Sequence, residues 1–271
     1  MMPSACKNIA VASAFSPRFV NVLAEAKRMR SRFGCDLSLI YVGDRNGETD
    51  RKFSQAFQEL DLPRDSTIHY AQGDPAAAIL RTVDEKEIDM VVAGALEKEV
   101  VLHPFLGNVA RRLVREAPCS VMLFIEPHTE PKPLQRMVFV ADYSDHSREA
   151  LKKTISLAAA EETERLYVIR LITTFDEIRA GRETPDADPA KTTADEETAL
   201  EELVLSMGQT DVPIEVRCIR GNTGFAASDF VQSVSADLLV VPVQALGRDE
   251  PLPPNISWIT DVIPCNLWVI R

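Results

Sequence analysis

The sequence lacks any long apolar run. No segment approaches the roughly 18 uninterrupted apolar residues that a membrane-spanning helix needs. A short apolar run, Ile9–Phe15, follows Lys7 and loosely imitates a signal peptide. Because this run is very short and leads directly into a helical pattern, we interpret it as a first β-strand. We therefore expect a cytoplasmic protein that has no membrane partner.

Positive charge is scarce as well. The 271 residues include 30 Lys and Arg against 41 Asp and Glu, which gives a formal net charge of −11 at pH 7. Such a chain is poorly matched to the phosphates of nucleic acids or to an anionic membrane surface. We therefore expect no nucleic-acid partner.

Cysteine and histidine are few and scattered. The five cysteines are odd in number and lack the C-x-x-C spacing, which disfavours a disulfide framework or a structural zinc site and fits a reducing cytoplasm. The four histidines have no carboxylate or thiol at metal-ligand spacing, so we expect no metal site. Cys119 and Cys265 each open the last apolar run of their half of the chain, where buried packing is favoured over reactivity.

The motifs that mark common reactions are absent. The sequence contains no G-x-x-x-x-G-K-[ST], G-x-G-x-x-G, H-E-x-x-H or G-x-S-x-G. No pair of carboxylates is marked out as a general acid and base. We therefore assign no catalytic residue and expect a protein that is not an enzyme, with at most slow incidental nucleotide hydrolysis.

What the chain does contain is the same unit twice. Four landmarks recur in the same order: an apolar run closed by a serine, a glycine, an aspartate before a second apolar run, and a Pro-Cys pair before a third. They lie at Asn8–Ser16 and Arg136–Ser144, Gly73 and Gly221, Asp89 and Asp237, and Pro118–Cys119 and Pro264–Cys265. This order indicates a duplication.

The spacing of the landmarks also sets the predicted domains. The offset between the copies grows near Thr173–Glu197, where Gly181, Pro185 and Pro189 stand among many charges and predict an inserted mobile loop. Three prolines make Glu126–Pro133 the predicted linker. The domains are therefore expected at residues 1–126 and 134–271.

Each unit alternates apolar strands with amphipathic helices, which predicts a parallel sheet covered on both faces. Ser16 and Ser144 are expected to cap the first helix of each unit. Any small-ligand site should lie at the carboxyl ends of the strands, near the topological switch point. In the first unit, strands are predicted at 9–15, 37–42, 67–71, 90–93 and 121–125, and further helices at 51–60, 75–86 and 107–116.

Several runs of the first unit resemble a universal stress protein, and the second unit does so moderately. These runs are Gly73–Leu80, Ile88–Gly94 and Leu106–Val121, together with Phe15-Ser16-Pro17 after the first strand. The resemblance implies two doubly wound α/β domains, each a five-stranded parallel sheet flanked by helices, of the adenine-nucleotide α-hydrolase-like type. It also implies that the domains pair as an internal pseudo-dimer through their last strands, Val121–Ile125 and Leu267–Ile270.

Some members of this family bind ATP through a pattern that resembles G-x2-G-x9-G-[ST]. Glycines let the backbone approach phosphates, and helix N-terminal amides donate to anions. Gly94, Gly107 and Asn108 stand at the matching spacing in the first unit, but Glu97 replaces the second glycine. A carboxylate there would repel phosphate in a partly desolvated site.

ATP-binding members also keep an aspartate at the end of the first strand, which contacts the nucleoside. Ala14 stands there in the first unit and Asp142 in the second. The second unit has lost the phosphate loop instead, since Pro242 replaces its first glycine and Pro251, Pro253 and Pro254 follow. Each unit keeps half a nucleotide site.

The candidate nucleotide-binding residues are therefore Gly94, Gly107, Asn108 and Asp142. Each also has a structural interpretation: the glycines permit turns, the asparagine caps a helix, and the aspartate binds local backbone amides. No cofactor is assigned with certainty, and ATP and AMP are the candidate ligands.

We expect a stress-response protein that acts by binding a ligand or a partner, with degenerate and weak nucleotide sites. One alternative is an ATP- or AMP-binding regulator that uses the Gly94 to Asn108 loop. A second is a nucleotide-consuming enzyme, for which no general base is found. A third is an interaction protein whose acidic segment Asp176–Glu202 contacts a protein partner.

Overall fold

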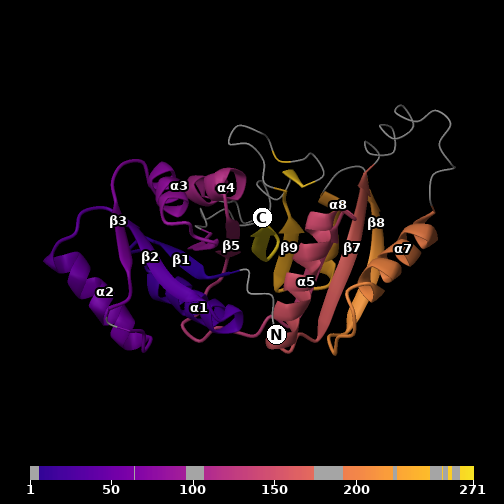
Figure 1. Cartoon of the computed structure of the whole chain (residues 1–271), viewed down its shortest axis with the longest axis horizontal. Coiled ribbons are helices and arrows are strands. Elements are labelled where there is room, and N and C mark those ends of the chain that lie inside the picture. Colours follow the sequence, from indigo (N-terminus) through magenta and orange to yellow (C-terminus); the bar gives the residue numbers. More distant parts are fainter. Residues whose placement is uncertain are drawn as a thin grey trace. The chain divides into compact units, whose positions relative to one another are not determined.

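The chain divides into two compact units, Met1–Lys132 and Pro133–Arg271. Figure 1 shows the computed structural model, which describes residues 6–63, 65–95, 107–173, 192–221, 225–244, 252, 256–257 and 263–271. Each unit is an α/β domain whose strands are joined by helices.

The first unit is a five-stranded parallel sheet in the order β3-β2-β1-β4-β5. Helices α1 and α2 lie on one face of this sheet, and α3 and α4 lie side by side on the other (Figure 1). The strand order reverses at β1, so the topological switch point lies between β1 and β4. The elements are β1 (Asn8–Ser13), α1 (Phe19–Phe33), β2 (Asp36–Val42), α2 (Gly47–Glu59), β3 (Ile68–Ala71), α3 (Pro75–Glu85), β4 (Met90–Gly94), α4 (Asn108–Glu116) and β5 (Ser120–Phe124).

The second unit repeats this topology, with the strand order β10-β9-β6-β7-β8. The predicted duplication and the predicted five-stranded parallel sheets are thereby confirmed. The elements are β6 (Arg136–Ala141), α5 (Asp145–Ala160), β7 (Arg165–Thr173), α7 (Thr193–Leu205), β8 (Ile214–Gly221), α8 (Phe225–Ser233), β9 (Leu238–Pro242) and β10 (Asn266–Ile270).

The core of each unit follows the inner strands. Every residue of β5 and of β9 is buried, as are four of the five residues of β4. Parallel strands covered on both faces need continuous apolar sequence, because neither face meets water. This requirement explains the uninterrupted apolar runs seen in the sequence.

The repeated aspartate has the same structural role in both units. The carboxylate of Asp89 accepts hydrogen bonds from the backbone amides of Lys7 (2.6 Å) and Asn8 (2.9 Å). The carboxylate of Asp237 accepts one from the amide of Arg136 (2.8 Å). In each unit this side chain ties the start of the first strand to the strand beside it, so the duplicated aspartates are structural.

The two predicted helix caps have different outcomes. Ser144 caps α5, because its hydroxyl accepts a hydrogen bond from the amide of Ser147 (3.0 Å). The prediction for Ser16 is wrong, since α1 begins at Phe19 and its N-cap residue is Arg18. The Ser16 carbonyl instead accepts the amide of Phe19 (3.0 Å), so a separate tight turn precedes the helix.

The predicted inserted loop is partly helical. Thr193–Glu197 form the first turn of α7, so the loop prediction is wrong for these residues. Thr192 and Asp195 make a reciprocal capping box, which is a strong helix-start signal. Gly181, Pro185 and Pro189 lie outside the described residues.

The predicted linker is held against α1 by polar side chains. The side-chain amide of Asn21 donates a hydrogen bond to the carbonyl of Pro127 (2.9 Å). The carboxylate of Glu25 accepts one from the backbone amide of His128 (3.5 Å). Arg28 donates to the carbonyl of Lys132 and pairs with Glu25 (2.9 Å). These contacts fix the path of the chain after β5 within the first unit.

Candidate functional site

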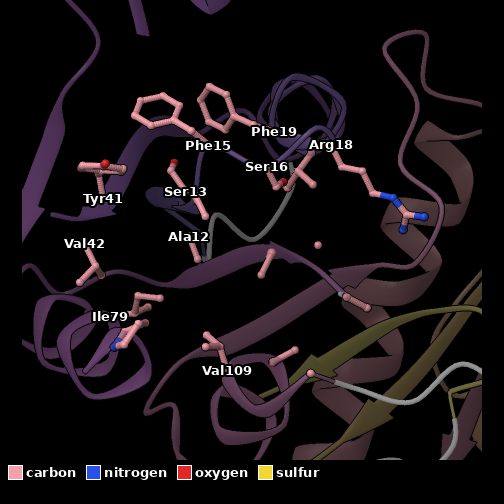
Figure 2. A pocket seen from close by; sticks show the side chains of 18 residues that line it. Ala12, Ser13, Phe15, Ser16, Arg18, Phe19, Tyr41, Val42, Ile79 and Val109 are labelled. Carbon is pink, nitrogen blue, oxygen red and sulfur yellow. The ribbon is translucent and has the colours of Figure 1, made fainter. Parts of the chain in front are cut away.

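A cavity of about 330 Å³ lies in the first unit at the carboxyl ends of β1, β2 and β4. This is the switch-point position predicted from the alternating pattern, and the volume is in the range of small-molecule sites. Figure 2 shows Phe15, Phe19 and Tyr41 along one side of the cavity, with Ile79 and Val109 on the opposite side.

Gly94 is one of the two predicted site residues that line this cavity. It ends β4 where α1 packs closely against the strand. A Cβ atom on Gly94 would lie 2.9 Å from Cγ2 of Val22, closer than real side-chain contacts allow. Packing against α1 therefore explains the glycine without any ligand.

Gly107 also lines the cavity, at the start of α4. It is the N-cap residue of that helix and has an extended backbone (φ −61°, ψ 155°). No side-chain hydrogen bond caps the helix at this residue. Asn108 is the first helical residue and is exposed, and it does not line the cavity. The suggestion that Asn108 caps the helix is also wrong, because Gly107 occupies that position.

Asp142 lies in the second unit and is bound by its own neighbours. Its carboxylate accepts hydrogen bonds from the amide (3.0 Å) and the hydroxyl (2.6 Å) of Ser144. The structural interpretation therefore accounts for this side chain. Pro242 is the last residue of β9, whereas Glu97, Pro251, Pro253 and Pro254 lie outside the described residues.

The residue after Asp142 is strained and tightly held. Tyr143 has a positive φ of 63°, which a bulky residue adopts rarely. Its hydroxyl donates to the carboxylate of Glu196 (2.9 Å), and the guanidinium of Arg170 lies 5.3 Å from its ring centroid. Burial, followed by the hydrogen bond to Glu196, raises the pKa of Tyr143. This tyrosine stays neutral and anchors α7 to the end of β6.

The cavity offers few polar groups. Among the described residues that line it, Arg18 carries the only charge. Its guanidinium donates to the carbonyl of Ile125 (3.1 Å) and points away from Tyr41 (Figure 2). The hydroxyl of Ser13 is bonded to the carbonyl of Val11 (3.2 Å). Ala14, directly after β1, adds only a methyl group to the lining.

An aromatic cluster stiffens one wall. The ring of Phe15 lies 5.4 Å from that of Phe19, 5.0 Å from that of Tyr41 and 4.8 Å from that of Phe53. The Lys52 ammonium lies 5.1 Å from the Phe15 centroid. Sequence reasoning did not identify these aromatic residues as site residues. They come from β2, two helices and a turn, and no linear spacing signals that they meet.

These surroundings favour contact with a flat, largely apolar group. The described lining residues include no His, Cys, Asp, Glu or Lys. Within the described part of the chain, no group of three or more metal-ligating side chains is found. In the same part, no helix is long and apolar enough to cross a membrane.

The fold and the position of the cavity define a tandem α/β protein with a cavity at the switch point of its first unit. The model of the universal stress protein family matches residues 6–124 and 133–270. The chain therefore belongs to the universal stress protein family and is a tandem two-domain member. The family resemblance seen in the sequence is confirmed.

Two solved structures have the same fold over nearly the whole chain. A functionally unknown protein from Pseudomonas aeruginosa PAO1 aligns over 98% of this chain and 93% of its own, with 15% identity and a TM-score of 0.71. A universal stress protein from Archaeoglobus fulgidus DSM 4304 aligns over 97% of this chain and 96% of its own, with 14% identity and a TM-score of 0.61. At such identities the likeness shows the fold alone.

Sequence relatives match shorter stretches. A protein of Thermus aquaticus, named as a universal stress protein in the QAH/OAS sulfhydrylase 3′ region, is 34% identical over 70 residues. That stretch is 26% of this chain and 50% of the relative. The chain spans no more than half the length of the curated relatives that it matches.

Proposed function

We propose that this protein is a stress-response protein that works by binding and not by catalysis, with the cavity of the first unit as its ligand site. The observation that carries this proposal is the cavity itself, which lies at the switch point and has Ala14, Gly94 and Gly107 in its lining. Adenine nucleotides bind there weakly, because the apolar lining leaves their polar groups without partners.

The weak binding of adenine nucleotides follows from the presence of Ala14 after the first strand. A carboxylate at the end of the first strand would accept hydrogen bonds from a nucleoside, whereas the Ala14 methyl group accepts none. A hydrogen bond to a charged group contributes about 1.5–3 kcal/mol. At about 1.4 kcal/mol per tenfold change, its absence lowers the affinity roughly tenfold to a hundredfold.

Adenosine is the sharpest probe of this reasoning, because it has no phosphate to be repelled by Glu97. A thermal-shift titration of the wild-type protein should stay flat up to millimolar adenosine. Ala14→Asp should produce a rise, since ligand at 100 times its Kd adds about 2.7 kcal/mol. Asp142→Ala, which removes a carboxylate from the other unit, is the comparison: it should lower the melting temperature through loss of the bonds to Ser144, but its response to adenosine should stay as flat as that of the wild type.

ATP and AMP with magnesium complete the test. The double change Ala14→Asp with Glu97→Gly should create ATP affinity that the wild type lacks. A wild-type protein that retains nucleotide after purification would refute the proposed weak binding. A steady-state assay with ATP and magnesium should show no turnover above a trace, and appreciable turnover would refute the non-catalytic role.

The alternative is an ATP- or AMP-binding regulator that uses the Gly94, Gly107 and Asn108 loop. Its support is that both glycines line one cavity and that α4 begins there without a side-chain cap. Helix N-terminal amides attract phosphate. Under this alternative, wild-type protein binds ATP much more tightly than adenosine, and the double change adds little.

A further inference from the structure

Two cysteines lie together at the end of the first unit opposite to the cavity. Cys6 stands two residues before β1, and Cys35 stands directly before β2. The cavity lies at the carboxyl ends of these strands, so the cysteine pair has no part in the ligand site. Both are free cysteines in the structure.

The backbone brings the two residues close. Strands β1 and β2 are parallel neighbours, with Asn8 in register with Asp36. The amide of Asp36 donates to the carbonyl of Lys7 (2.9 Å), so strand pairing extends to the residues that flank both cysteines. Neighbouring strands lie about 4.7–4.9 Å apart. Extended by one residue, this register places Cys35 opposite Lys7 and Cys6 on the diagonal. With a rise of about 3.3 Å per residue, the diagonal Cα separation is roughly 6 Å, within the range of about 4.4–6.8 Å that a disulfide needs.

The end of α1 holds Cys35 in place. Gly34 is the C-cap residue in the left-handed conformation (φ 63°), which turns the chain directly from α1 into β2. The amides of Gly34 and Cys35 both donate to the carbonyl of Arg30 (2.9 and 3.3 Å). Cys35 is 8% exposed, whereas Cys6 is only partly buried. A small reagent therefore reaches the pair from the side of Cys6, the more exposed of the two thiols.

The two side chains are hydrogen-bonded to each other. This bond is the largest cause that lowers the pKa of Cys35, and its own backbone amide and the Arg30 guanidinium act in the same direction. Burial and the Asp36 carboxylate oppose them. A thiol with a lowered pKa has more of the nucleophilic thiolate at neutral pH.

We propose that Cys6 and Cys35 form a redox-sensitive thiol pair that closes to a disulfide when the protein meets a peroxide. The Cys35 thiolate attacks one peroxide oxygen, the O–O bond breaks, and a sulfenic acid and water form after proton uptake. The Cys6 thiol then attacks the sulfenic sulfur, forms the S–S bond and releases a second water. Two thiols and one peroxide thus give one disulfide and two waters, and an external thiol reverses the step.

The other cysteines serve as internal comparisons. Burial raises the pKa of both Cys218 and Cys265, which disfavours their thiolates. Cys119 is buried directly before β5. Oxidation of the native protein should therefore select one pair among the five thiols.

The test oxidises the full chain with hydrogen peroxide and counts thiols after denaturation. Wild type should fall from five reactive thiols by two, to three, and dithiothreitol should restore five. Tryptic mapping should find the peptide that ends at Lys7 linked to peptide Phe33–Arg45. Cys218→Ser, the matched control, should form the same link. Cys6→Ser and Cys35→Ser should form no disulfide.

Three results of the oxidation without urea would overturn the proposal. They are five thiols retained in oxidised wild type, a link that joins other cysteines, and a Cys6–Cys35 link that joins two copies of the chain. The last is detected as a dimer on a non-reducing gel. Oxidation in urea separates the effect of the fold from intrinsic reactivity, because selectivity for this pair should then be lost. Equal selectivity in urea would also overturn the proposal.

Discussion

Replacing Gly94 with alanine should destabilise the first unit by about 2 kcal/mol, within the roughly 1–3 kcal/mol typical of overpacked cores. The new Cβ atom would meet Cγ2 of Val22 at 2.9 Å. Val22 is 6% exposed and lies inside α1, where one valine rotamer dominates, so its methyl group cannot rotate away. The whole helix must shift relative to β4 instead.

A double-mutant cycle isolates this contact. Val22→Ala alone should cost about 1.5 kcal/mol, from two buried methyl-sized groups at about 0.8 kcal/mol each. In that background, Gly94→Ala should cost almost nothing, because the colliding methyl group is gone. The coupling energy between the two positions should thus be about 2 kcal/mol, so the double variant should be more stable by that amount than the sum of the two single losses implies.

Urea unfolding followed by far-UV circular dichroism measures these differences. Gly47→Ala is the matched control, since Gly47 is exposed at the start of α2 and a Cβ atom added to it would meet no other atom within 4 Å. It should stabilise the protein by about 0.4–1 kcal/mol through the unfolded state. A coupling energy near zero would refute the packing explanation of Gly94 and would favour a role in ligand approach.

Three further predictions concern other parts of the molecule. Ser144→Ala should lower the free energy of unfolding by about 1 kcal/mol, because α5 loses its cap. Ser16→Ala at the equivalent position should lower it little, because Ser16 does not cap α1. Equal losses of stability in urea unfolding would contradict this difference between the two helix starts. Asp89→Ala should cost about 1–2 kcal/mol, because two backbone amides lose a charged acceptor, and an unchanged unfolding midpoint would argue against that role. Burial, followed by the charge of Lys86, lowers the pKa of His69. The unfolded chain then binds more protons below about pH 6.5, so stability falls as the pH falls through that value. His69→Gln should show a shallower loss of stability on acidification, and identical slopes would refute the assignment.

Much of the fold could be predicted from the sequence, because its signals are periodic and local. Apolar runs separated by amphipathic stretches predicted the parallel sheets, and the duplicated landmarks predicted two units. Ser144 with its helical stripe predicted a cap correctly. The same reasoning failed at Ser16, because a tight turn and the packing of Phe15 and Phe19 delay the helix by a few residues. Pairing of the two domains through their last strands stays a prediction.

The candidate site was predicted only in part. The strand pattern indicated its place at the switch point, and Gly94 and Gly107 were named in advance. The exclusion of Asn108 from the cavity depends on the helix register of α4. The self-contained bonding of Asp142 depends on the turn before α5. Local geometry decides both cases, and residue spacing alone does not report it.

The sequence by itself determined the repeated α/β topology and the family, because hydrophobic periodicity and short motifs are properties of the linear chain. The tertiary structure decided which side chains share a surface. Phe15, Phe19 and Tyr41 meet around one cavity, and Cys6 meets Cys35, because parallel strands align residues that lie far apart in the sequence. Such contacts depend on strand order and register, which cannot be read from the spacing of residues along the chain.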